Sequence, residues 1–171
     1  MNFMADVKRS RLQNDTGILH VEDACILLVK TEWNADIVDE LERGCIRELQ
    51  KHGVKKIIGL TVPGSFEIPF AIKNFWENAK KKSRPDAFIA LGCVLRGDTP
   101  HFEYICKAVT DGILQLNLVL PVPVIFGVLT VDHIEQARER IGGLHGHKGE
   151  EAGITAIKMI SLKTQPASKR N

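Results

Sequence analysis

The sequence predicts an α/β protein in which a four-stranded parallel sheet lies between two layers of helices. Four apolar runs, at residues 24–29, 56–62, 86–95 and 123–130, have the length and continuous apolar character of strands covered on both faces. Stretches with helical character separate them, and strands that alternate with helices form parallel sheets through right-handed crossovers. A chain of 171 residues has the size of one domain with a full core.

Each connection between the strands carries helix signals. In the first connection Asn34 is the predicted N-cap and Gly53 the stop signal, and the apolar stripe between them consists of Ile37, Leu41, Cys45 and Leu49. The second helix is expected to begin near Phe66 or Ile68 and to fade before Pro85, and the third to begin near Phe102. Further helical stretches are expected around residues 133–141 and 149–161.

The two ends of the chain differ from the middle. Residues 1–20 show no sustained periodicity and predict an irregular arm, either flexible or bound to a partner, whereas residues 163–171 form a polar, basic tail. We therefore expect one domain over residues 21–162. No apolar run is long enough to span a bilayer, and no apolar signal segment follows the early charges, which predicts a cytoplasmic protein, or a stromal one if a transit segment was removed.

Charge and motifs exclude several classes of function. The formal net charge is +2 with no long basic block outside the tail, which disfavours nucleic-acid binding. No glycine-rich dinucleotide motif follows the first strand, and no phosphate-binding loop motif occurs. The four cysteines have neither disulfide-exchange nor zinc spacing and are expected to be buried free thiols in a reducing compartment; they are Cys25, Cys45, Cys93 and Cys106.

In open parallel sheets ligands bind at the carboxyl ends of the strands. After the first strand, Trp33 offers an aromatic face to a planar heterocycle, although it could equally plug the sheet edge. After the second strand, Ser65, Phe66 and Glu67 lie at a helix start, where free N–H groups can donate to carbonyl or phosphate oxygens. Glu67 could bind hydroxyls or amines, or serve only the helix dipole.

The turn after the third strand combines a glycine with a histidine. Gly97 can adopt a positive φ, and the N–H groups of Asp98 and Thr99 would then form an anion-binding nest. His101 follows the nest and can pass protons in either direction near pH 7. A single histidine at a helix start is otherwise a capping or surface residue, but these neighbours favour a catalytic role.

Cations gather after the fourth strand. The guanidinium of Arg140 and the ammonium of Lys148 both suit a phosphate group, the alternative being an ordinary charged helix end. His145 and His147 indicate a metal only weakly, because no carboxylate or cysteine cluster accompanies them. We therefore expect no metal site.

Four segments together resemble one family. Residues 63–69 (PGSFEIP), 91–104 (LGCVLRGDTPHFEY), 123–130 (PVIFGVLT) and 135–149 (EQARERIGGLHGHKG) are similar in order and spacing to the signature segments of lumazine synthases. The resemblance covers about residues 24–162 and implies a flavodoxin-like fold. It also implies the penultimate step of riboflavin biosynthesis, in which 5-amino-6-(D-ribitylamino)uracil and 3,4-dihydroxy-2-butanone 4-phosphate condense to 6,7-dimethyl-8-ribityllumazine.

The resemblance also implies a role for each candidate residue. His101 would transfer protons, and no metal or organic cofactor would be needed. The pyrimidine and its ribityl chain would be bound by Trp33, Ser65, Phe66, Glu67, Cys93, Val94, Leu95 and Phe126. The phosphate would be bound by Asp98, Thr99, Arg140 and Lys148.

The same resemblance implies an assembly built from pentamers, with Phe126, Arg140 and Lys148 contributed by the adjacent subunit. The short segment between Arg140 and Lys148 favours a sixty-subunit shell over a pentamer or a pair of pentamers. A fifth, N-terminal strand added to a neighbouring subunit and an association with riboflavin synthase are further expectations. Nucleic acid and membranes are not expected partners.

Three positions depart from the family pattern. Trp33 stands where many members have Phe, Cys93 replaces a common Thr, and His147 replaces the usual Asn before Lys148. Two other functions stay open: a non-catalytic assembly or flavin-binding protein, and some other flavodoxin-like phosphate binder. The presence of Glu67, His101 and Arg140 argues against the first, and four matching segments argue against the second.

Overall fold

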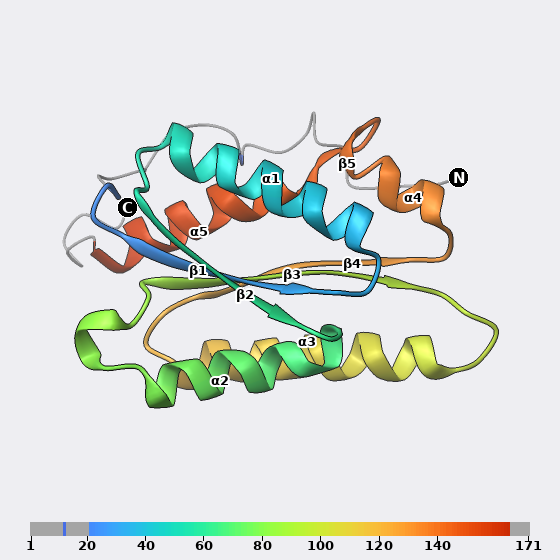
Figure 1. Cartoon of the computed structure of the whole chain (residues 1–171), viewed down its shortest axis with the longest axis horizontal. Helices are drawn as coiled ribbons and strands as arrows, with labels where there is room; N and C mark the ends of the chain where they lie inside the picture. Colours follow the sequence, from blue (N-terminus) through green and yellow to red (C-terminus); the bar gives the residue numbers. More distant parts are fainter. Residues whose placement is uncertain (1–11, 13–20, 165–171) are drawn as a thin grey trace.

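The computed structural model describes residue 12 and residues 21–164, and it has the predicted α/β architecture (Figure 1). Its main sheet contains β1 (Cys25–Thr31), β2 (Lys56–Val62), β3 (Ala87–Leu95) and β4 (Val124–Val131). All neighbouring strands are parallel, in the order β2-β1-β3-β4. The predicted N-terminal arm, apart from Leu12, and the chain after residue 164 lie outside the described residues, and the fifth strand with them.

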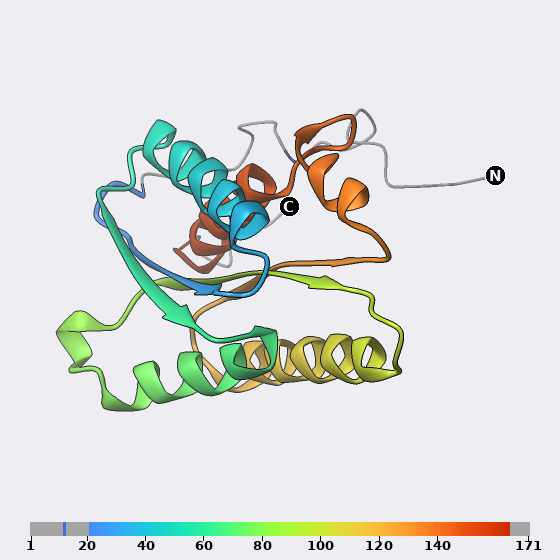
Figure 2. The ribbon, with the colours of Figure 1, turned by 45° about the vertical axis from the view of Figure 1, so that its right-hand side comes forward.

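Helices cover both faces of the sheet, as Figures 1 and 2 show. One face packs against α1 (Ala35–Lys51) and α5 (Lys148–Thr164), and the other against α2 (Ile68–Asn78) and α3 (His101–Val119). The predicted stripe of α1 is confirmed, because Ile37, Leu41, Cys45 and Leu49 are all buried in the first of these two cores. β1 and β3 are covered on both sides, which explains their unbroken apolar sequences.

Shorter elements complete the connections. Two 3₁₀ turns, η2 (Ser65–Glu67) and η3 (Lys81–Ser83), flank α2. The helix expected over 133–141 is shorter than predicted: α4 covers only Ile134–Arg138, and a small antiparallel hairpin follows, formed by β5 (Ile141–Gly143) and β6 (Gly146–His147). Gly142 and Gly146 have φ angles of 114° and 75°, conformations that break a helix and suit a tight hairpin.

Asn34 precedes α1 as predicted, but its side chain does not cap the helix. Asn34 has a left-handed backbone (φ 56°, ψ 46°), and its Nδ2 donates to the carbonyl oxygen of Cys93 over 2.8 Å. The carbonyl of Asn34 accepts the first helical N–H groups instead. The amide therefore links the loop after β1 to the end of β3.

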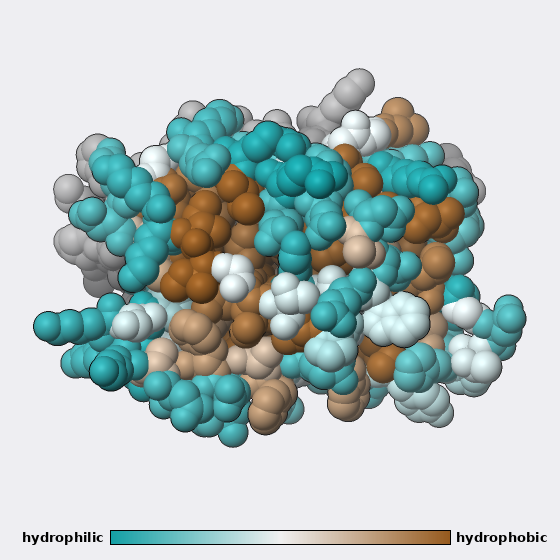
Figure 3. Space-filling model, in the orientation of Figure 1, coloured by the Kyte–Doolittle hydropathy of each residue, from teal (hydrophilic) through white to brown (hydrophobic). Residues whose placement is uncertain are grey.

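Both edges of the sheet leave apolar surface uncovered. Among the described residues β4 has β3 as its one strand neighbour, and Phe126 on β4 is 43% exposed. On the opposite edge, β2 carries the partly buried Ile57, Ile58 and Leu60. Figure 3 shows apolar atoms at the surface in the band between the two helical layers, where β2 runs in Figure 1. No helix in the described part of the chain is both long and apolar enough to cross a membrane.

Candidate active site

The carboxyl ends of the four strands meet at one side of the molecule, on the right in Figure 1. A pocket of about 600 Å³ opens there, a volume typical of a site for small molecules. Its lining consists of Trp33, Asn34, Gly64, Ser65, Phe66, Glu67, Cys93, Val94, Leu95, His101 and Ile105. Eight of the residues predicted for the site therefore share one cavity, although they come from three strand ends.

Two large aromatic side chains form the open wall of this pocket. Trp33 is 73% exposed and Phe66 is 59% exposed, so neither plugs the core. Gly64 lies beside Trp33 and Glu67: a Cβ atom at Gly64 would be 3.1 Å from Glu67 Oε2 and 3.5 Å from Trp33 Cδ1. The ring and the carboxylate thus converge on a position without a side chain, which suits a flat ligand that also carries hydrogen-bond donors.

The inner wall is narrow and largely apolar. Ser65 and Cys93 are buried, and they adjoin Gly92, where a Cβ atom would come within 2.8 Å of Ser65 Oγ. Burial, together with the negative charge of Asp36, raises the pKa of the Cys93 thiol to about 11. Cys93 therefore presents a neutral thiol to the pocket at physiological pH.

This pKa predicts slow alkylation of Cys93. At pH 8 only about one thiol in a thousand is ionised when the pKa is near 11, against about one in ten at the ordinary value of 9.0. Iodoacetamide should modify Cys93 at least ~100-fold more slowly than a free exposed thiol, and its rate should rise about tenfold per pH unit towards pH 11. Peptide mass spectrometry over time measures both, and rapid labelling at pH 7 would contradict the prediction.

His101 is the first residue of α3 and is exposed to the pocket. The loop before it is anchored by Arg96, which donates to Asp132 over 2.6 Å and to Glu103, and which lies 4.1 Å above the ring of Phe102. The hydrogen bond from Arg96 lowers the pKa of the Glu103 carboxyl. Sequence reasoning did not single out Arg96, because its partners lie 7 and 36 residues away.

The predicted anion nest is not formed as expected. Gly97 does not have a positive φ, and nothing lies within 4 Å of where its Cβ would be. Because Arg96 holds the loop from its side chain, the turn needs no left-handed glycine. Asp98 and Thr99 are exposed on this loop, next to His101 but outside the pocket lining.

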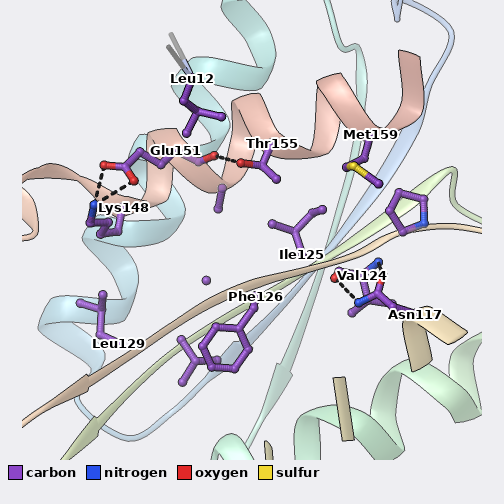
Figure 4. A pocket seen from close by; sticks show the side chains of 14 residues that line it. Leu12, Asn117, Val124, Ile125, Phe126, Leu129, Lys148, Glu151, Thr155 and Met159 are labelled. Atoms are coloured by element: carbon purple, nitrogen blue, oxygen red, sulfur yellow. Dashed lines mark hydrogen bonds and ion pairs between the residues drawn. The ribbon is translucent and has the colours of Figure 1, made fainter. Parts of the chain in front are cut away.

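The other predicted residues lie apart from this pocket. Phe126 and Lys148 line a second cavity of about 500 Å³ beside β4 and α5, shown in Figure 4. Lys148 Nζ donates to both carboxylate oxygens of Glu151 over 2.8 Å, and Arg140 Nη1 donates to the carbonyl oxygen of Gln136 over 2.7 Å. Arg140 lines neither cavity. A single chain therefore does not unite the two groups of candidate residues.

Asn34 is a pocket residue that the sequence did not identify as one, although its place before α1 was predicted. Two substitutions of Asn34 distinguish the contribution of its left-handed backbone to stability from that of its side-chain hydrogen bond. Asn34→Ala should lower the free energy of unfolding by about 2 kcal/mol, from left-handed strain and a lost hydrogen bond, whereas Asn34→Gly should lose only about 1 kcal/mol. Urea unfolding measures both variants, and equal losses would contradict the left-handed requirement.

The two histidines that weakly indicated a metal have carboxylate partners in the structure. Within residues 21–164, no three His, Cys, Asp or Glu side chains converge on a point that could hold an ion. His145 and His147 pair instead with Glu139 and Glu40.

All four cysteines are free; three are buried as expected, and Cys106 is half-buried.

Comparison with known proteins adds an independent line of evidence. A family model described as 6,7-dimethyl-8-ribityllumazine synthase matches residues 23–164. Curated relatives carry the same name. The chain is 49% identical to the protein of Parabacteroides distasonis over 79% of this chain and 83% of that one. It is 50% identical to the protein of Bacteroides fragilis, over 79% and 93% of the two chains.

A third relative of that name, from Porphyromonas gingivalis, is 50% identical over 83% of this chain and 87% of its own length. The matched region contains the whole sheet, all five helices of Figure 1 and every candidate residue. The chain therefore belongs to the 6,7-dimethyl-8-ribityllumazine synthase family.

Proposed function

We propose that this protein is a lumazine synthase, which condenses 5-amino-6-(D-ribitylamino)uracil with 3,4-dihydroxy-2-butanone 4-phosphate in riboflavin biosynthesis. Family membership over nearly the whole domain carries the assignment. The pocket supports it, because an aromatic wall, a carboxylate and a histidine meet in one cavity of suitable volume. A cytoplasmic location stays a prediction.

The side chains divide between the two substrates. Trp33 stacks on the pyrimidine, while Ser65, Phe66 and Glu67 hold its edge and the ribityl hydroxyls. The wall formed by Cys93, Val94 and Leu95 completes the pyrimidine pocket. The phosphate of the second substrate is held by Asp98 and Thr99, on the loop before His101, and by the cations Arg140 and Lys148.

The reaction then proceeds by proton transfers and eliminations. The 5-amine of the pyrimidine attacks the ketone carbon, and the resulting carbinolamine loses water to form an imine. Elimination of inorganic phosphate follows, and the ribitylamine nitrogen closes the ring with loss of a second water. His101 carries protons between these steps, and the pocket holds the two reactants in register; none of the steps needs a metal or a redox cofactor.

We further propose that the complete site forms between subunits of a pentamer. Phe126 and Lys148 lie at a different cavity from Trp33 and His101 within one chain. No described strand pairs with the outer side of β4, and Phe126 is partly exposed there. Both features favour burial against a neighbour, which would bring the two groups together. The short segment between Arg140 and Lys148 favours the sixty-subunit shell, and riboflavin synthase is a candidate partner.

The first test mixes purified protein with both substrates and follows the absorbance and fluorescence of the lumazine product above the uncatalysed rate. Turnover that falls by about 10²–10⁴-fold in His101→Ala supports the assignment. Tight ligand binding without turnover would favour the non-catalytic flavin-binding protein instead. Light scattering on the same sample measures the assembly, and a species of five subunits would exclude the shell.

Subunit mixing tests the shared site directly. His101→Ala and Arg140→Ala remove one residue from each group, so each variant assembled alone should be weakly active. If random co-assembly pairs an intact half from each chain, about a quarter of the sites regain both residues, and activity recovers to about a quarter of that of the unmodified protein. No recovery, in mixtures shown to co-assemble, would indicate that each site lies within one chain.

A further inference from the structure

His147 is a buried histidine at the junction of the hairpin and α5, outside the pocket around His101. It is 8% exposed and is the last residue of β6, immediately before α5. Its Nε2 lies 3.3 Å from Oε1 of Glu40 on α1, and its Nδ1 accepts from the backbone N–H of Glu150 over 3.4 Å. One ring therefore joins the end of the hairpin and the first turn of α5 to α1, whose Glu40 lies 107 residues earlier in the sequence.

These two contacts select one form of the imidazole. A backbone N–H can only donate, so Nδ1 must be unprotonated, and Nε2 carries the hydrogen that is donated to Glu40. Glu40 stays a carboxylate, because hydrogen bonds from Arg43 and then from His147 lower its pKa. The bond to Glu150 satisfies an N–H group in the first turn of α5, as an N-cap side chain does.

The imidazole ring of His147 fits into space that three glycines leave unfilled. A Cβ on Gly44 of α1 would lie 2.0 Å from His147 Cε1, and a Cβ on Gly149 would lie 3.0 Å from the same atom. Gly142 of the hairpin adjoins the opposite edge, since its Cβ would lie 3.7 Å from Cδ2. The ring thus lies directly on the α1 backbone, and this position requires a residue without a side chain at Gly44.

The backbone next to the His147 ring is connected to Arg140 and Lys148, the two cations proposed to bind the phosphate. His147 pairs with Ile141, the residue after Arg140, across the hairpin. The N–H of Lys148 donates to the carbonyl of Arg140 over 2.8 Å, so the backbones of the two cations are joined beside the ring. A shift of His147 must therefore move Lys148 directly and Arg140 through that hydrogen bond.

We propose that His147 is a positioning residue that fixes Arg140 and Lys148 for the phosphate-bearing substrate, by capping α5 and anchoring the hairpin to Glu40. This inference rests on the proposed function for the identity of the substrate. An asparagine, the usual residue here in the family, retains the capping acceptor but has no ring to lie on Gly44. His147 thus adds a connection to α1 that an asparagine cap lacks.

The kinetic test compares the two substrates separately. His147→Ala should raise the KM for the butanone phosphate about fivefold to tenfold, while kcat and the KM for the pyrimidine change less than about twofold. His147→Asn should recover most of the loss, because it restores the cap. Equal increases in both KM values, or no change in either, would overturn the positioning role.

A matched control uses the similar pair at the other end of α1. His52 Nδ1 lies 3.3 Å from Glu48 Oε1, far along the helix from Glu40. His52→Ala should leave both KM values unchanged. A rise in the phosphate KM in this control would show that the effect reports general loosening of α1.

A second variant displaces the His147 ring through a substitution on α1. Gly44→Ala should displace the ring and raise the phosphate KM as His147→Ala does, and the double variant should be no worse than His147→Ala. Independent, multiplied losses would contradict the proposal. If neither variant folds, ¹⁵N spectra of the unmodified protein decide: protonated Nε2 with unprotonated Nδ1 at pH 7 supports the proposal, and protonated Nδ1 overturns it.

The proposed function can fail separately. If the unmodified protein forms no lumazine, that function falls, and binding of inorganic phosphate becomes the probe for Arg140 and Lys148. His147→Ala should then weaken phosphate binding about fivefold relative to the unmodified protein. Unchanged phosphate affinity would overturn the positioning role whatever the reaction is.

Discussion

His101→Ala should lower kcat for lumazine formation by about 10²–10⁴-fold, the range for loss of a general acid–base group. His101 is the one histidine in the pocket lining. Because it lies exposed at the first turn of α3, its removal should leave the fold intact. The remaining rate comes from holding the two substrates together.

His133→Ala is the matched control for this variant. His133 is also an exposed histidine just before a helix, at the end of β4, and its nearest ionic partner is Glu135. Its removal should leave kcat unchanged. Steady-state rates for both variants, with circular dichroism to verify folding, measure the difference, and a His101→Ala enzyme with an unchanged rate would refute the catalytic role.

Gly149→Ala should destabilise the protein, although alanine ordinarily favours a helix over glycine by up to about 1 kcal/mol. The reason is close contact between α5 and α1: the new Cβ would lie 2.0 Å from the carbonyl oxygen of Leu41 and 2.8 Å from its carbonyl carbon. Backbone atoms cannot rotate away, so the two helices must separate. The expected loss is about 2–3 kcal/mol of unfolding free energy, typical of overpacking in a core.

Gly153→Ala, one turn further along α5, provides the comparison. Its Cβ would lie 3.1 Å from the carbonyl oxygen of Cys45, a tight contact that a shift of a few tenths of an ångström relieves. Strain and helix propensity then nearly cancel, and the change should stay within about 1 kcal/mol. Thermal or urea unfolding ranks the variants, and equal stability of Gly149→Ala and Gly153→Ala would contradict the packing argument.

The sheet could be predicted from the sequence because β1 and β3 are buried on both faces, so their apolar runs are unbroken. The hairpin after α4 could not. Residues 139–143 have no strand pattern, and only the positive φ of Gly142 and Gly146, a tertiary outcome, separates a hairpin from a helix end. The role of Asn34 could not be predicted from local sequence either, because the carbonyl that accepts its hydrogen bond lies 59 residues away.

The family resemblance supplied Cys93, Val94 and Leu95. Strand ends identified five pocket residues, since parallel strands bring their carboxyl ends to one edge; these are Trp33, Ser65, Phe66, Glu67 and His101. The strand ends did not place Asn34 or Ile105 in the pocket. They did not reveal that Phe126 lies at a separate cavity. In an unbroken apolar run such as β4, alternation cannot tell which side chains face the outside. The resemblance assigned Phe126 to the site of a neighbouring subunit, and that assignment stays a prediction.

The outer edge of β4 affects how efficiently the protein refolds. Among the described residues no second strand pairs with β4 beside the partly exposed Phe126, and sheet edges of this kind can also pair with unrelated or partly folded strands. The proposed association between subunits competes with these encounters, and both processes become faster at higher protein concentration. The yield of assembled protein after dilution from denaturant should therefore be highest at an intermediate protein concentration, at which subunits associate before they aggregate.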